Sequence, residues 1–230
     1  MISKKPDFER VNSIANEILA TTKCIETFPY SMIALAKEQT DVQICSYRKA
    51  REKYHLPISA FGSDSAHLEE YNGAHIIFFN ECEKSYRIRF SIGHELGHII
   101  LGHKMNLSEK DSLYGVQEVE TNCFTAQLVM PEQILRACNR RGYRVSVDYI
   151  KRSFLVSEEA AERRRTTLQH TIIEWKSQSE RMYDDIILKR YEKFLDEIAP
   201  MKQDYYSDFE FDDFTRQKVR DVWLDERGRR

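Results

Sequence analysis

The chain has 230 residues, of which 41% are hydrophobic, and its 35 basic and 37 acidic side chains leave a net charge of -2 at pH 7. This length can hold one substantial core or a domain with a smaller lobe, and the near-neutral charge excludes a general attraction to nucleic acid. Five scattered cysteines without a C-x-x-C pair argue against a disulfide framework, and no run is apolar enough for a signal core or membrane span. We therefore expect a cytoplasmic protein.

The first elements expected along the chain are a helix and a small sheet. Pro29 to Ala36 reads as a helix with proline in its first turn. Val42 to Tyr47 alternates weakly and His75 to Phe79 is a short apolar run, so both suit strands.

A helix from about Phe90 to Gly102 follows, and it carries the pentapeptide His94-Glu95-Leu96-Gly97-His98. Helical residues four positions apart lie about 40° apart in rotation, so both imidazoles project from one face and can bind one divalent ion. Glu95 lies beside the first histidine, where it can take a proton from water. This H-E-x-x-H pattern is typical of zinc metallopeptidases, with zinc as the expected metal and manganese as the alternative. Gly93 and Gly97 weaken the helix but let a neighbouring element approach closely.

A third metal ligand is needed, because catalytic zinc usually keeps three protein ligands. The metzincin pattern H-E-x-x-H-x-x-G-x-x-H is not met, since Leu101 and Lys104 occupy its last two fixed positions. His103 lies nine residues beyond His94, about 180° round a continuing helix. We therefore expect His103 to be a helix C-terminal residue that interacts favourably with the dipole, outside the metal site.

The third ligand is expected on a second helix, over Glu118 to Pro131, which ends at the proline. Glu118 and Asn122 share a face at i, i+4 spacing, so Glu118 can bind the metal while Asn122 hydrogen-bonds a ligand. Glu120 does not share that face, and we expect it to be a solvated surface acid. A different helix register would make Glu120 the ligand instead.

The rest of the chain is expected to be helical. Ser157 followed by Glu158 and Glu159 predicts a helix start. The next arginines, 163 to 165, fan around that helix and form no single stripe, so a solvated basic face is expected and direct nucleic-acid binding is not. Thr171 to Ala199 predicts a long helix, and between Asp204 and Phe214 acids alternate with aromatics in a tail that suits docking in a groove or disorder. We expect this tail to influence substrate choice or self-inhibition.

The two helical motifs together resemble one family. Arg87 to His98, followed by Glu118-x-Glu120-x-Asn122-x-Phe124-x-Ala126-x-Leu128-x-Met130-Pro131, looks like the ImmA/IrrE metallo-endopeptidases, whose usual form is close to R-F-T-I-A-H-E-L-G-H and E-x-E-A-N-x-F-A-A-x-L-L-M-P. The chain has Gly93, Thr121 and Thr125 where the family commonly has alanine, which are small-for-small changes at packing positions. The resemblance extends from about Asp7 to Leu168.

The resemblance implies an α+β fold with a zincin-like, gluzincin-like metalloprotease core. Zinc would be bound by His94, His98 and a glutamate of the second motif, with Glu95 as the catalytic residue. We expect the metalloprotease domain over residues 1–142, a helix-turn-helix-like segment over 143–168, and a helical C-terminal extension with the acidic and aromatic tail over 169–230.

The resemblance also implies a narrow protein substrate. This would be a helix-turn-helix transcriptional repressor or antitoxin, often encoded beside the protease in a mobile element or stress operon, and its cleavage would relieve repression. The alternative is a metal-stabilised regulator that binds the repressor or DNA without cutting. Intact Glu95 favours the enzyme, because structural metal binding needs no base beside the ligands. The oxyanion donor is not identified, and Tyr86, Tyr114 and His103 are the candidates.

Overall fold

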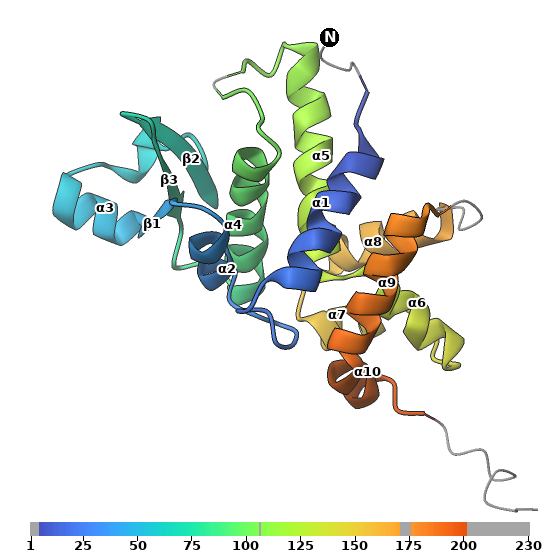
Figure 1. Cartoon of the computed structure of the whole chain (residues 1–230). Helices are drawn as coiled ribbons and strands as arrows, with labels where there is room; N and C mark the ends of the chain where they lie inside the picture. The colour runs from blue at the N-terminus through green and yellow to red at the C-terminus, as the bar shows by residue number, and fades with distance from the viewer. Residues whose placement is uncertain (1–4, 106, 171–175, 202–230) are drawn as a thin grey trace, which may run out of the picture. The chain divides into compact units, whose positions relative to one another are not determined.

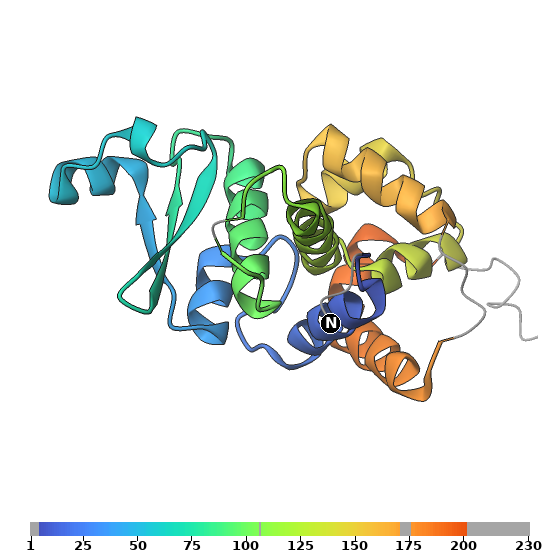
Figure 2. The same cartoon turned by 90° about the horizontal axis from the view of Figure 1, so that it is seen from above.

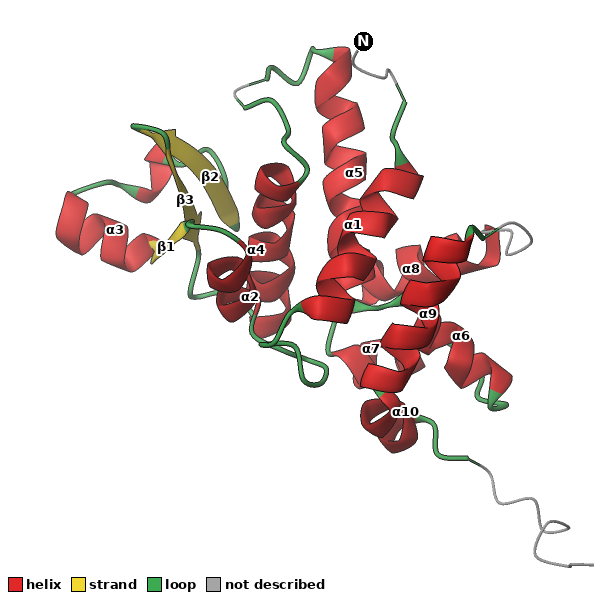
Figure 3. Ribbon diagram, viewed as in Figure 1, coloured by secondary structure: helices red, strands yellow, loops and turns green. Residues whose placement is uncertain are grey.

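The computed structural model describes residues 5–105, 107–170 and 176–201. The elements in chain order are α1 (Phe8–Thr21), α2 (Met32–Gln39), β1 (Gln43–Ser46), α3 (Tyr47–Tyr54), a 3-10 turn (Ile58–Ala60), β2 (Ala66–Tyr71), β3 (Ala74–Phe79), α4 (Ser85–Ile100), α5 (Ser112–Val129), α6 (Glu132–Arg140), α7 (Val147–Phe154), α8 (Glu158–His170), α9 (Gln178–Arg190) and α10 (Glu192–Ile198). Helices predominate and the strands form one small sheet (Figures 1 and 3), which confirms the α+β prediction. The chain divides into two compact units after Ala199, and the site described below lies in the first.

The sheet has the order β1-β3-β2, with β1 parallel and β2 antiparallel to β3. Strands β1 and β3 lie where the sequence predicts strands, whereas β2 was not predicted. Asn72 and Gly73 form the two-residue turn between β2 and β3, and their φ values of 51° and 78° suit the hairpin turn that Asn-Gly favours. This dipeptide was therefore the signal for β2.

Helix α4 lies between the sheet and α5, as both views show (Figures 1 and 2). Its Ile92 and Leu96 are buried in the main core together with Phe124 and Leu128 of α5. A Cβ atom built on Gly93 would lie 2.9 Å from Thr125 Cγ2, and one built on Gly97 would lie 3.1 Å from Phe124 Cδ1. The two glycines therefore allow α4 and α5 to pack closely, as predicted.

The remaining helices extend this core on the far side of α5. Helix α1 packs against α5 and α9, α6 packs against α9 and α10, and α7 packs against α8. Two predictions need correction. The first helix after Pro29 begins only at Met32, because Ser31 accepts a hydrogen bond from the Ala34 amide and so caps it. The long helix predicted up to Ala199 is two helices over its described part, α9 and α10, while residues 171–175 and the acidic and aromatic tail lie outside the described residues.

Candidate metal centre

Three side chains from two helices converge at the contact between α4 and α5. His94 Nε2 lies 3.3 Å from Glu118 Oε2, and His98 Nε2 lies 3.3 Å from Glu118 Oε1. The two imidazole Nε2 atoms are 3.4 Å apart. All three side chains are partly buried, with exposed fractions of 18% and 15% for the histidines and 29% for the glutamate. The i, i+4 spacing on α4 and the position of α5 therefore direct the ligand atoms to one point.

The chemistry and spacing of this donor set fit a divalent cation. Two imidazole nitrogens and a carboxylate are ligands that zinc prefers, and the three side chains offer ligand atoms that all lie within 4.8 Å of one another. In a tetrahedral zinc site with ordinary bond lengths, neighbouring ligand atoms are about 3.3–3.4 Å apart. The two imidazole nitrogens have that spacing, and each of them lies at that distance from one of the two Glu118 oxygens.

Glu118 and His94 shift each other's pKa values so that their charged forms are favoured. Hydrogen bonds from His94 and His98 hold the pKa of Glu118 well below its usual range. Burial by itself would lower the pKa of His94, but the hydrogen bond with Glu118 and the charge of Glu95 raise it. Glu118 is therefore a carboxylate, ready to bind a cation.

Glu95 lies beside this cluster as a half-buried carboxylate. Burial raises its pKa, while the nearby His94, His98 and His67 oppose the rise. In the described part of the chain, Glu95 forms no hydrogen bond or ion pair. Its carboxylate is therefore available to a water molecule or a substrate.

Asn122 lies one turn beyond Glu118 on α5. Its Nδ2 donates to the Glu118 backbone carbonyl at 2.7 Å, and its side chain lies near enough to His94 to contribute to raising the pKa of His94. Sequence reasoning missed Thr121, whose Oγ1 lies 3.5 Å from His94 Nε2. Its i, i+3 spacing from Glu118 is the signal that would have found it.

Glu120 is not the solvated surface acid that we expected. It is only 7% exposed, because α1 covers this face of α5. Its Oε1 accepts a hydrogen bond from the Asp7 backbone amide at 2.7 Å, and its Oε2 lies 2.9 Å from His103 Nε2. Glu120 lies outside the group that could hold a metal ion.

The expected position of His103 on a continuing helix is also wrong. The helix ends at Ile100, and Gly102 adopts a φ of 66° that an L-residue with a side chain rarely tolerates. The Gly102 and His103 amides donate to the Ile99 and His98 carbonyls, at 3.1 and 3.0 Å, which is the Schellman pattern of a helix end. This turn brings His103 back over His98, and their Nδ1 atoms are 3.1 Å apart.

The three candidate oxyanion donors lie in different surroundings. Tyr114 lies one turn before Glu118 on α5, and the charge of Glu118 is the largest cause that raises its pKa. Tyr86 lies in the first turn of α4, with the Lys84 ammonium 5.9 Å from its ring centroid. His103 is engaged by His98 and Glu120 as described. Tyr114 is therefore the candidate whose electrostatic environment includes the cluster.

The run of arginines 163 to 165 does not form a continuous basic surface. Arg164 is only 4% exposed and donates to the Met130 carbonyl at 2.9 Å and to the Gln127 side-chain oxygen. Arg163 is exposed and pairs with Glu159 one turn earlier. Arg164 thus ties α8 to the end of α5 and is not accessible to a phosphate backbone. Among the described helices, none is both long and apolar enough to span a membrane.

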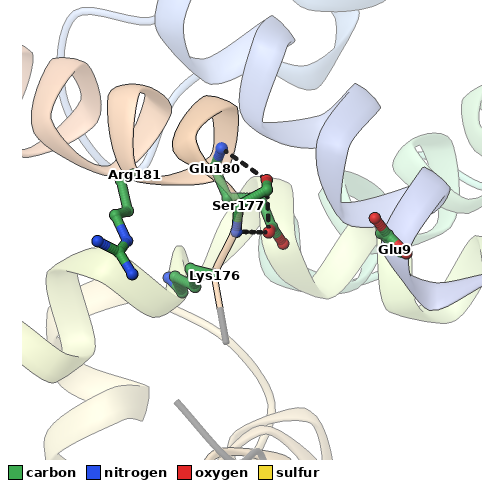
Figure 4. A pocket seen from close by; sticks show the side chains of 5 residues that line it. All are labelled: Glu9, Lys176, Ser177, Glu180 and Arg181. Carbon is green, nitrogen blue, oxygen red and sulfur yellow. Dashed lines mark hydrogen bonds between the residues drawn. The ribbon is translucent and has the colours of Figure 1, made fainter. Parts of the chain in front are cut away.

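A pocket lies elsewhere, between α1 and the start of α9 (Figure 4). It is lined by Glu9, Lys176, Ser177, Glu180 and Arg181. Ser177 and Glu180 form the capping box of α9, and Lys176 pairs with Asp184 at 2.5 Å. Helix capping and ion pairing thus account for Ser177, Glu180 and Lys176, and the pocket contains none of the residues of the candidate metal centre.

Comparison with known protein families is consistent with the candidate metal centre. No curated protein matches the chain. The model of the Peptidase_M78 family, described as the IrrE N-terminal-like domain, matches residues 50–166, which is half of the chain. The match begins later than the Asp7 start that we expected, but it contains both helical motifs and all three converging side chains. It confirms the predicted relation to the ImmA/IrrE family, and the chain belongs to the Peptidase_M78 peptidase family.

Proposed function

We propose that the protein is a metal-dependent endopeptidase that cleaves one specific protein, a helix-turn-helix transcriptional repressor or an antitoxin, and so relieves repression. One observation carries the catalytic part of this proposal. Glu95 is a carboxylate without a partner among the described residues, and it lies beside three side chains whose ligand atoms converge. A site that served only to stabilise the fold would not need this acid.

The residues of the chain have distinct roles in this reaction. His94, His98 and Glu118 would hold the cation, zinc by donor type with manganese as the alternative. When bound, the ion would polarise the scissile carbonyl and favour ionisation of water. Glu95 accepts a proton from the attacking water while the water oxygen bonds to the carbonyl carbon. Glu95 then delivers that proton to the amine nitrogen as the carbon–nitrogen bond breaks. Asn122, beside the cluster, would help to keep His94 in position.

The described sheet beside the cluster has an open edge to which an extended protein substrate could bind. Strand β2 has a partner strand on one side only within the described sheet, and it packs against α4. His67 of β2 lies near enough to influence the pKa of Glu95. An extended segment of a substrate can add to such a strand edge through main-chain hydrogen bonds. The restriction to a repressor or antitoxin rests on the resemblance of the paired motifs.

We also propose that the first unit contains the peptidase core over residues 1–142 with a zincin-like arrangement of α4, α5 and the sheet. Residues 143–168 would be a helix-turn-helix-like pair and residues 169–230 a helical extension. Helices α7 and α8 supply the two helices of the middle segment, and they are joined by a short turn with Leu155 at a φ of 47° and Ser157 as the start of α8. Short turns of this kind join the helices of such motifs.

The test uses the full chain, its Glu95→Gln variant and a matched Glu159→Gln control, each loaded with zinc. Glu159 is 74% exposed on α8, so its change leaves the site intact. Each protein is incubated with the helix-turn-helix protein encoded beside it, and fragments are identified by mass spectrometry. We expect one specific cleavage by the parent and the control, and a loss of about 10²–10⁴-fold in rate for Glu95→Gln. Equal binding without cleavage by all three would instead support the non-cleaving regulator.

A further inference from the structure

Two buried side chains behind the metal centre form a continuous chain of hydrogen bonds that ends on a proposed ligand. Glu120 Oε2 lies 2.9 Å from His103 Nε2, and His103 Nδ1 lies 3.1 Å from His98 Nδ1. The side chains of His103 and Glu120 are 4% and 9% exposed. The other nitrogen of His98, Nε2, faces Glu118 and His94. The backbone amide of Asp7, at the start of α1, donates to Glu120 Oε1 at 2.7 Å.

Each link of this chain needs one donor and one acceptor, and this requirement determines the positions of the protons. A neutral histidine carries its proton on one nitrogen and accepts on the other. If His98 binds a cation through Nε2, its proton lies on Nδ1 and is donated to His103 Nδ1. His103 must then carry its own proton on Nε2, which donates to the Glu120 carboxylate. A carboxylate is an acceptor only, so Glu120 favours this order, whereas Glu118, 3.3 Å from His98 Nε2, favours a proton on that nitrogen when no cation is bound.

We infer that Glu120 and His103 are positioning residues that hold His98 in the tautomer with Nε2 free for the metal. The inference rests on the proposed metal centre. Hydrogen bonding to the second nitrogen of a metal-binding histidine is a general way to fix its tautomer and ring orientation. Here the carboxylate acts through a second histidine. The Gly102 turn supports this role, because it places His103 between α4 and α5.

One isosteric variant should reverse the order of donors and acceptors in the hydrogen bonds from Glu120 to His98. In Glu120→Gln, one end of the amide still faces the Asp7 N–H, which can only donate, so the amide oxygen must occupy that end. The amide NH₂ then faces His103 Nε2 and donates to it. His103 must carry its proton on Nδ1 and donate to His98 Nδ1. The proton of His98 is thereby moved to Nε2, where it points at the metal position.

The test has two readouts that need no protein substrate. The tautomer of His98 is read from long-range ¹⁵N–¹H NMR correlations in metal-free Glu118→Ala, which removes the competing acceptor 3.3 Å from His98 Nε2. Zinc affinity is measured with Glu118 present, by competition with a chromophoric chelator. In Glu118→Ala we expect the His98 proton on Nδ1, and adding Glu120→Gln should move it to Nε2. Glu120→Gln alone should lower zinc affinity by about 10–100-fold. Glu159→Gln, the same change at an exposed position, should leave both readouts unchanged.

The outcomes separate this inference from the proposed function. A Glu118→Ala protein whose His98 carries its proton on Nε2 overturns the inference. A tautomer that Glu120→Gln leaves unchanged in that background, together with unchanged zinc affinity of Glu120→Gln alone, overturns it as well, while leaving the metal centre intact. A parent that binds no zinc refutes the metal centre itself. Thermal melting of the metal-free variants distinguishes a loss of affinity from a loss of fold.

Discussion

The contact between α4 and α5 makes a quantitative prediction at Gly93. In Gly93→Ala, the added methyl group would lie 2.9 Å from Thr125 Cγ2 and 3.0 Å from Met32 Cε. The methionine methyl is the end of a flexible side chain and can move aside. Thr125 is fully buried and β-branched, so it has little freedom. Overpacking of this kind costs about 1–3 kcal/mol, and alanine gains about 1 kcal/mol over glycine in a helix, so we expect a net loss of about 1 kcal/mol.

The second change, Thr125→Ala, should rescue the first. It removes the Cγ2 methyl, and it also removes a hydroxyl whose oxygen is buried without a hydrogen-bond partner in the described structure. The lost methyl costs about 0.8 kcal/mol and the relieved hydroxyl offsets about 1–3 kcal/mol, so the single variant should be neutral or stabilised. In the double variant the overlap disappears and the helix gain remains. We expect a favourable coupling of about 1–3 kcal/mol between the two positions.

Urea unfolding of the parent, both single variants and the double variant measures this coupling. Gly115→Ala is the control, since Gly115 lies on α5 with nothing within 4 Å of the added methyl group. It should stabilise the protein by about 1 kcal/mol and be additive with Gly93→Ala. Additivity of the Gly93 and Thr125 changes within about 0.5 kcal/mol would refute the argument. So would a Gly93→Ala variant as stable as Gly115→Ala. The double variant has alanine at both positions, as does the usual form of the two motifs that this chain resembles.

Three further predictions concern the rest of the molecule. Arg164→Met removes the side-chain donor to the buried Met130 carbonyl and leaves Gln127 Oε1 with the Glu132 amide, so it should destabilise the protein by about 2–3 kcal/mol in urea unfolding; an effect no larger than that of replacing an exposed arginine would contradict this role. Removing metal with a chelator should lower the melting temperature, while zinc at a hundred times its dissociation constant should add about 2.7 kcal/mol of stability, an effect that Glu118→Gln should largely abolish. The Glu38 carboxylate accepts hydrogen bonds from the Lys23 and Cys24 amides, which lower its pKa, so its contribution is present above the unfolded-state pKa and is lost as pH falls through the folded-state pKa. Unfolding measured from pH 7 down to pH 3 should therefore show a smaller loss of stability for Glu38→Gln than for the parent, and identical slopes would argue against the contribution.

Helical periodicity alone determined the central part of the candidate site. His94, Glu95 and His98 lie within one helix, where 3.6 residues per turn dictate which side chains share a face. The same periodicity on α5 separated Glu118 from Glu120, and the structure places the Glu118 carboxylate against both histidines. Local rules also suffice for β2, because the Asn72-Gly73 turn has its own backbone preference. Predictions of this kind depend on residues only a few positions apart.

Contacts between distant segments decided the rest. Glu120 looks like a surface acid on its own helix, and it is buried because α1 packs across α5 and Asp7 donates to its carboxylate. His103 is far round a continuing helix by periodicity, but the Gly102 turn ends α4 and places the ring between His98 and Glu120. The sequence by itself therefore determined which side chains share a helix face in the candidate metal centre, since that depends on the geometry of single helices. The surroundings of those side chains depend on how the helices pack together, and only the tertiary structure decided them.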